Sequence, residues 1–268
     1  MSAPNAISPA TREARAPELA TIPPESLWIC GVRIENLTKT DACNRLRALI
    51  ERRTAPPRTV YIVNAHTINL ACDRPAFRDV LNGADAVWGD GTGVRWAARR
   101  KGVRMRDNLV GTDLVPLFMS TAAGKRYRYF LFGGHEPVVR TAAAHVATTF
   151  GVTMAGHAHG HFEPSDNDAV IERINASRAD VLLVAMGNPV QEQWIHDNRA
   201  ALRVQLCIGI GGLVDHWGGA LDRAPRWIRD RGFEWAHILM RQPHKWRRYV
   251  LGNPKFVLRV LRDSRSHR

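Results

Sequence analysis

The apolar residues of this chain come in short runs that alternate with longer amphipathic segments. Runs such as VLLVAM (181–186) and LCIGI (206–210) contain no polar alternation, which is typical of strands covered on both faces. Segments of about ten to fifteen residues with helical character separate the runs, as expected for βαβ units. The pattern predicts an α/β fold with a Rossmann-like, mostly parallel sheet flanked by helices.

The same pattern divides the chain into three regions. Residues 1–26 are rich in Ala, Pro and Ser and lack an apolar segment, so we expect a disordered leader and no signal peptide. Residues 27–219 carry the alternation of strands and helices, beginning with a hairpin around Gly31, and form the expected catalytic α/β domain. Residues 220–268 are basic, aromatic-rich and helical in character, and form an expected C-terminal appendage.

Two predicted strand ends carry polar residues. The run 61–63 leads into Asn64, Ala65 and His66, and the apolar run that ends at Trp88 leads into Asp90, which has a glycine on either side. Ligands bind at the carboxyl ends of strands in open parallel sheets, so we expect Asn64 and Asp90 to border one site. A carboxylate there can serve as a general base toward a hydroxyl group. The alternative is a turn aspartate that bonds its own backbone or caps the following helix.

A third candidate is the segment that begins at Gly187, where a predicted strand gives way to a helix. A helix N-terminus presents unpaired N–H groups that suit a phosphate, and Gln191 and Glu192 in the first turn can bond a sugar or a base. Proline and glutamate are also ordinary residues at a helix start, so a purely structural role stays open.

Cofactor and metal motifs find little support. The glycine turns at 133–134 and 209–212 do not form GxGxxG, and no phosphate-binding loop motif occurs, so an NAD-linked oxidoreductase lacks its fingerprint. Three histidines at 157, 159 and 161 invite a metal site, but a polar loop is favoured because no acid or cysteine cluster accompanies them. The DND triplet beginning at Asp166 imitates a metal-binding DxD, yet helix capping explains it better. We expect no cofactor and no metal. The four cysteines form no CxxC pair, which fits a reducing cytosol.

The charge of the chain is uneven. Of a formal net charge of +13, most lies in residues 223–268, where Lys and Arg far outnumber the acids. The expected partner is therefore anionic, which includes a membrane surface, a phosphate-bearing substrate and nucleic acid. Aromatic residues between the arginines suit a lipid headgroup zone and also stacking on nucleic acid, so a nucleic-acid-binding protein is the competing class. No apolar stretch reaches the roughly 18 to 20 residues of a transmembrane helix.

Several segments together resemble one family, the bacterial WecG/TagA/CpsF glycosyltransferases. They are VNAHTINLA, ADAVWGDGTGV, VGTDL, FLFGG, INASRADVLLVAMGNPVQEQWI and GIGGLVDHWGGALDRAPRWIRDRGFEW, followed by WRRY and GNP. These segments span roughly residues 59–254 in the family's order, so the resemblance covers most of the chain.

The resemblance implies an inverting transfer of a sugar from a UDP-sugar to a polyprenyl-pyrophosphate-linked saccharide, without a metal, on the cytosolic face of the plasma membrane. Such an enzyme serves exopolysaccharide, surface antigen or cell-wall polymer biosynthesis. Asp90 matches the family's catalytic base, and the appendage is expected to dock on the anionic membrane. The implied substrate-binding residues are Asn64, His66, Gly91, Gly187, Gln191, Glu192 and three arginines near the pyrophosphates, Arg223, Arg226 and Arg229.

Three positions depart from the family pattern. Ile62 stands where a threonine is common, Asn108 stands where an arginine is common, and His66 replaces a commonly acidic residue. Because these positions border the expected sugar pocket, the donor stays open between glucose, N-acetylmannosamine and a uronic acid. The acceptor sugar, the linkage and the oligomeric state, including a homo-oligomer, also stay open.

Overall fold

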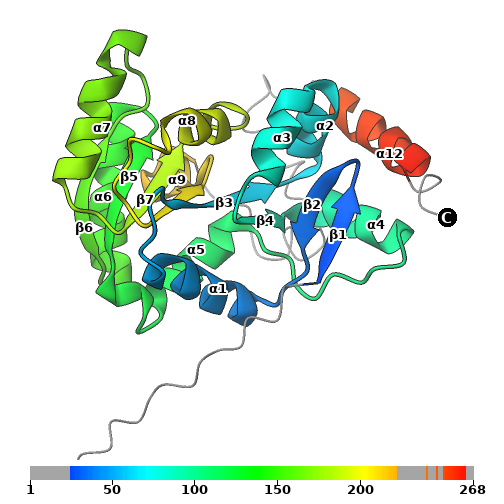
Figure 1. The fold of residues 1–268 in the computed structure, drawn as a ribbon, viewed down its shortest axis with the longest axis horizontal. Coiled ribbons are helices and arrows are strands. Elements are labelled where there is room, and N and C mark those ends of the chain that lie inside the picture. The colour runs from blue at the N-terminus through cyan, green and yellow to red at the C-terminus, as the bar shows by residue number, and fades with distance from the viewer. Residues whose placement is uncertain (1–24, 222–239, 241–245, 247–249, 264–268) are drawn as a thin grey trace, which may run out of the picture.

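The computed structural model describes residues 25–221, 240, 246 and 250–263, and the structural statements below concern these residues. Eight strands among them form one sheet in the order β1-β2-β4-β3-β8-β7-β5-β6 (Figure 1). β1 and β2 form the hairpin expected around Gly31, and the other neighbouring strands run parallel. The predicted mostly parallel sheet is therefore confirmed. The strands are β1 (Ser26–Ile29), β2 (Val32–Glu35), β3 (Arg58–Val63), β4 (Ala86–Gly89), β5 (Arg128–Gly133), β6 (Thr153–Ala158), β7 (Val181–Ala185) and β8 (Leu206–Gly209).

Helices cover both faces of this sheet. They are α1 (Lys39–Glu51), α2 (Ala65–Asp73), α3 (Pro75–Asn82), α4 (Gly91–Arg100), α5 (Gly111–Ser120), α6 (Glu136–Phe150), α7 (Asn167–Ala176), α8 (Val190–Asn198), α9 (Leu213–Trp217) and α12 (Gly252–Asp263), with 3-10 turns η1 (Gly124–Arg126) and η2 (Pro164–Asp166). One apolar cluster joins the sheet to α2, α3, α4, α7, α8 and α12, and a second joins it to α1, α5, α6 and α9. The predicted flanking by helices is confirmed.

The strand β7 shows why its sequence lacks alternation. All five of its residues are buried. Leu182 and Val184 belong to one apolar cluster, and Val181 and Leu183 belong to the other. Successive side chains of a strand point to opposite faces, so a strand with helices on both faces needs an apolar residue at every position.

Local signals set several helix boundaries. Thr38 caps α1 in a capping box with Asp41. The segment between Asn64 and β4 folds into two helices, α2 and α3, which meet at Arg74 and Pro75. Proline lacks an N–H and disfavours helical dihedrals at the residue before it, and Arg74 is accordingly extended (φ −133°, ψ 92°).

The C-terminal helix α12 packs against α2 at one end of the molecule (Figure 1). Phe256 and Val260 of α12 are buried. Asn69 Nδ2 of α2 donates to the Gly252 carbonyl at 2.7 Å, and Asp73 pairs with Lys255 at 2.8 Å and with Arg259. The helical character predicted for this part of the appendage is confirmed, whereas the predicted leader lies outside the described residues, except Glu25 and Ser26 at its end.

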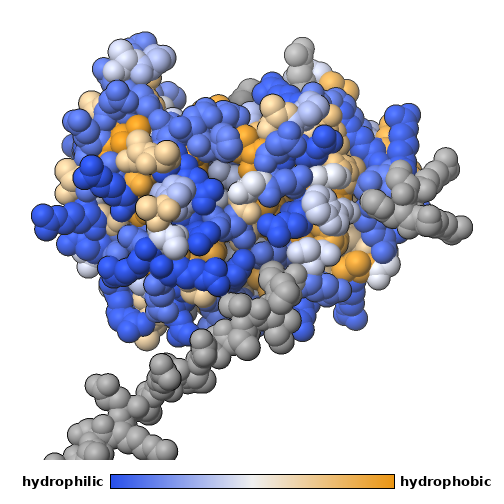
Figure 2. Space-filling view, in the orientation of Figure 1, coloured by the Kyte–Doolittle hydropathy of each residue, from blue (hydrophilic) through white to orange (hydrophobic). Residues whose placement is uncertain are grey.

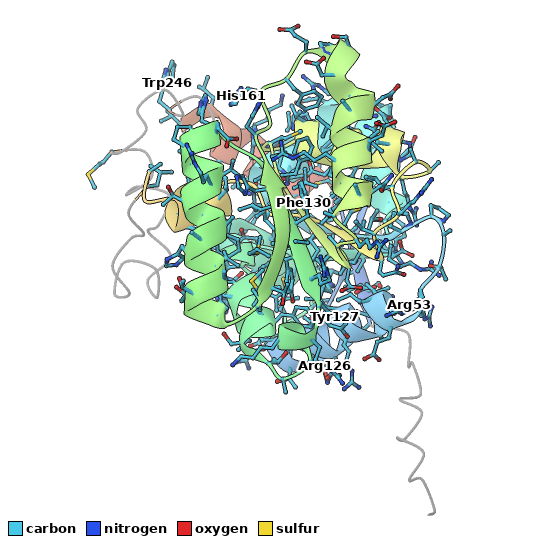
Figure 3. All side chains as sticks on the ribbon, turned by 90° about the vertical axis from the view of Figure 1, so that its left-hand side faces the viewer. Arg53, Arg126, Tyr127, Phe130, His161 and Trp246 are labelled. Atoms are coloured by element: carbon cyan, nitrogen blue, oxygen red, sulfur yellow. The ribbon has the colours of Figure 1, made fainter. Side chains whose placement is uncertain are left out.

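The two ends of the sheet can be told apart in Figure 3. In Figure 3, Tyr127 just before β5 marks the amino ends of the parallel strands, and His161 beyond β6 marks the carboxyl ends. Trp246 is drawn at the same upper end as His161 (Figure 3). Polar residues cover most of the face seen in Figure 2, and apolar residues there form small separate areas. The candidate polar residues follow the carboxyl ends of the strands.

Candidate active site

Asn64 and Asp90 follow two neighbouring strands. β3 and β4 pair in parallel with Val63 opposite Gly89, and the Asp90 N–H donates to the Val63 carbonyl at 2.8 Å. The residues that come next along each strand, Asn64 and Asp90, therefore stand at the same edge of the sheet. The helices α2 and α4 that start there are in close contact, since a Cβ added at Gly93 would lie 3.1 Å from the Cβ of Ala65.

Asp90 occupies the N-cap position of α4, but its side chain makes no capping hydrogen bond. The capping bond that the sequence suggested as one structural alternative is therefore not made. The extended backbone of Asp90 (φ −111°, ψ 131°) and the left-handed Gly91 (φ +89°) turn the chain sharply between β4 and α4. A Cβ at Gly91 would meet nothing within 4 Å, so the space beside this turn is open.

Asn108 supports this turn, although the sequence identified it only as a departure from the family pattern. Its Oδ1 accepts the Gly91 N–H at 2.8 Å. The Gly91 N–H, at the start of α4, has no carbonyl partner within the helix, and the Asn108 side chain accepts it instead. This bond fixes the peptide that follows Asp90. No short-range signal points to this contact, because the two residues lie 17 positions apart in an irregular segment.

Asn64 has a structural task as the N-cap of α2. Its Oδ1 accepts the N–H groups of His66 at 3.0 Å and Thr67 at 3.2 Å, and the Thr67 hydroxyl completes a capping box. These bonds orient the amide, so that its Nδ2 is the group left to contact a ligand. His66 lies in the first turn of the same helix and is half-buried.

The segment after β7 places Gln191 and Glu192 below the surface. Gly187 has a left-handed φ of +76°, and Gln191 and Glu192 are 2% and 0% exposed. The Gln191 Nε2 donates to Glu192 Oε1 at 2.7 Å, and Gln191 Oε1 accepts the Gly211 N–H at 2.9 Å. The Asn188 side chain also donates to Glu192 Oε1. Sequence reasoning placed both residues in the first turn of this helix but did not foresee that they bond to each other.

Burial raises the pKa of Glu192 from its ordinary 4.5 to about 7, although N–H groups from Gln191 and Asn188 favour the charged carboxylate. Desolvation dominates because Oε2 of Glu192 is buried without a hydrogen-bond partner among the described residues. Burial therefore extends the protonated form of Glu192 toward neutral pH.

The other sequence candidates belong to different elements or fall outside the described residues. His157 belongs to β6, His161 stacks on His135 with ring centroids 4.0 Å apart, and the described residues contain no group of three metal-binding side chains. Asp166 stands at the N-cap of α7 but makes no side-chain capping bond, so the capping role expected from the sequence is wrong. Arg223, Arg226 and Arg229 fall outside the described residues.

The four cysteines are free thiols, consistent with the absence of paired motifs. A hydrogen bond from Cys30 lowers the pKa of the Cys72 thiol to about 7, and burial raises that of Cys207 to about 12. Every helix in the described part of the chain falls short of the length and apolarity that crossing a bilayer requires.

Known proteins are similar in sequence to this chain over most of its length. The model of the glycosyl transferase WecG/TagA/CpsF family matches residues 27–268. An N-acetylglucosaminyldiphosphoundecaprenol N-acetyl-beta-D-mannosaminyltransferase from Bacillus subtilis (strain 168) is 30% identical over 195 residues, which are 72% of this chain and 75% of that protein. An enzyme of the same name from Bacillus spizizenii is 32% identical over 197 residues, covering 73% and 76%. The chain, whose Asp90 and Asn64 stand at neighbouring strand ends, therefore belongs to the WecG/TagA/CpsF family of glycosyl transferases.

Proposed function

We propose that this glycosyl transferase moves a sugar from a UDP-sugar to a saccharide carried on a polyprenyl diphosphate, and that Asp90 is its catalytic base. The observation that carries the proposal is the placement of Asp90 beside Asn64 at the carboxyl edge of the sheet. A carboxylate in this position can take the proton of an acceptor hydroxyl. The hydroxyl oxygen then attacks the anomeric carbon, and the bond to the UDP oxygen breaks with inversion.

The relatives suggest which sugars to test first. Both are named as transferring N-acetyl-beta-D-mannosamine to N-acetylglucosaminyldiphosphoundecaprenol. We therefore propose UDP-N-acetylmannosamine as the first donor and a diphosphoundecaprenol-linked N-acetylglucosamine as the first acceptor, with the product entering a cell-wall polymer. Glucose and uronic acid donors remain as comparison donors because Ile62, His66 and Asn108 border the site.

Charge on the departing UDP needs stabilisation, and cationic side chains supply it in the absence of a metal. Arg223, Arg226 and Arg229 are the proposed groups, from their place in the family motif. Lys255 and Arg259 of α12 pair with Asp73 instead.

The proposed reaction is tested with purified protein, the three UDP-sugars and the lipid-linked acceptor. Asp90→Asn is expected to abolish transfer while UDP binding, followed by calorimetry, persists. Asp166→Asn is the matched control, because it removes an exposed carboxylate from another helix start and leaves the Asn64–Asp90 edge intact. Full transfer by the Asp90 variant would end the assignment of the base.

We further propose that the protein docks on the inner membrane surface through α12. One side of this helix is buried against α2, and its other side carries Val257, Leu258 and Leu261, which are 38%, 55% and 38% exposed. Arg262 is exposed on the same helix, and a cation beside apolar side chains suits an anionic lipid interface.

Vesicle sedimentation tests this docking. Leu258→Asp is expected to weaken binding to vesicles that contain anionic lipid. Leu117→Asp is the matched control, because Leu117 is a 43% exposed leucine on α5. Equal effects of the two substitutions, or none from Leu258→Asp, would remove α12 from the docking surface.

A further inference from the structure

The turn between β7 and α8 is built around one buried carboxylate. Glu192 is 0% exposed, and its Oε1 accepts N–H groups from the side chains of Asn188 and Gln191. Hydrogen bonds to a carboxylate are stronger than those between neutral groups. One oxygen of Glu192 therefore holds two neighbouring side chains in place.

Gln191 links Glu192 to the turn that follows β8. Its Nε2 donates to Glu192, which leaves its Oε1 to accept the Gly211 N–H at 2.9 Å beyond β8. A flipped amide would direct NH₂ toward the Gly211 N–H and lose both bonds. Gly209 leaves room for this arrangement, because a Cβ added there would lie 2.7 Å from Gln191 Nε2.

The two turns joined in this way border the candidate site. Gly187 and Gly211 both have left-handed backbones, with φ of +76° and +52°, and an added Cβ at either would meet nothing within 4 Å. β8 pairs with β3, whose end leads into Asn64. The backbone next to Asn64 at the open edge is therefore shaped by side chains that are themselves buried.

We propose that Glu192 is a positioning residue for the transfer reaction, which holds the side chains of Asn188 and Gln191 so that Gln191 fixes the backbone at Gly211. The inference rests on the function proposed above. It assigns Glu192 the task of orienting Asn188 and Gln191, in place of the direct substrate contact expected from the sequence. Glu192 acts by keeping the glycine turns after β7 and β8 in the shape that receives the donor.

A double-mutant cycle tests this chain of contacts, with kcat and KM measured for one donor and acceptor pair. Glu192→Ala and Gln191→Ala are each expected to lower kcat about tenfold or more, and the double variant no further than the more damaged single variant. Glu192→Gln keeps an oxygen that can accept the two N–H groups, so it is expected to recover most of that loss. Gln193→Ala is the control, since Gln193 is exposed on the same helix and its side chain donates to Asp197, away from Glu192.

Amide exchange at Gly211 gives a readout that does not depend on turnover. Exchange of this N–H is expected to accelerate in Glu192→Ala and Gln191→Ala, and to remain slow in Glu192→Gln. If the wild-type protein transferred no sugar, the proposed function would fail, while Gly211 exchange would still show whether Glu192 holds this turn.

The inference would be overturned if the losses of kcat were additive in the double variant. It would also be overturned if Glu192→Gln were as inactive as Glu192→Ala while the Gly211 N–H still exchanged slowly. Either result would assign Glu192 a direct contact with substrate. If Glu192→Ala does not fold, Gly209→Ala tests the same link by displacing the Gln191 amide while Glu192 stays in place. Lower kcat with faster Gly211 exchange in that variant supports the inference, and unchanged values contradict it.

Discussion

The ionisation of Glu192 predicts an unusual dependence of stability on pH. In the unfolded chain this carboxyl titrates near its ordinary 4.5, whereas in the fold its pKa is about 7. The folded state therefore binds more protons between these values, and stability falls as pH rises through this window. The difference of about 2.5 pKa units corresponds to about 3 kcal/mol of folding free energy, present at low pH and lost above about pH 7.

Glu192→Gln removes this titration while preserving the shape of the side chain. The free energy of unfolding, measured by urea denaturation between pH 5 and pH 8.5, is expected to fall with pH more steeply for the wild type than for Glu192→Gln. The difference between the two proteins should change by roughly 2 to 3 kcal/mol across this range.

Glu172→Gln is the control, because it removes one carboxylate from the exposed surface of α7. A difference between wild type and Glu192→Gln that stays constant from pH 5 to pH 8.5, or that changes in the opposite direction, would refute the reasoning. It would mean that Glu192 in the fold titrates as it does in the unfolded chain.

Three further outcomes follow from individual contacts. Asn108→Ala removes the partner of the Gly91 N–H and is expected to lower kcat by about tenfold with UDP affinity little changed, as kinetics and calorimetry would show. Phe256→Ala leaves a cavity between α12 and the helices beneath it, and should cost about 3 kcal/mol of unfolding free energy in urea titrations. Iodoacetamide at pH 7, followed by mass spectrometry, should modify Cys72 first and buried Cys207 last.

Much of the site could be predicted from sequence because its residues sit at strand ends. The apolar residues before Asn64 and before Asp90 each predict a strand, and parallel strands bring their carboxyl ends to one edge of the sheet. The contacts that refine the site could not be predicted in this way. Asn108 reaches Gly91 from an irregular segment, and whether Asp90 caps its helix depends on a side-chain orientation that residue type leaves open.

The sequence by itself determined the class of the fold, the order of its strands and helices along the chain, and the family. These properties depend on local periodicity and on the order of short motifs, and both can be recognised from residues that are close together in the sequence. Tertiary structure alone decided that β3 lies between β4 and β8, that α12 packs on a helix whose Asn69 is 183 positions from its bonding partner, and that Glu192 is buried. Such contacts join segments far apart in the chain, and their energy comes from packing and desolvation, which no periodic pattern records.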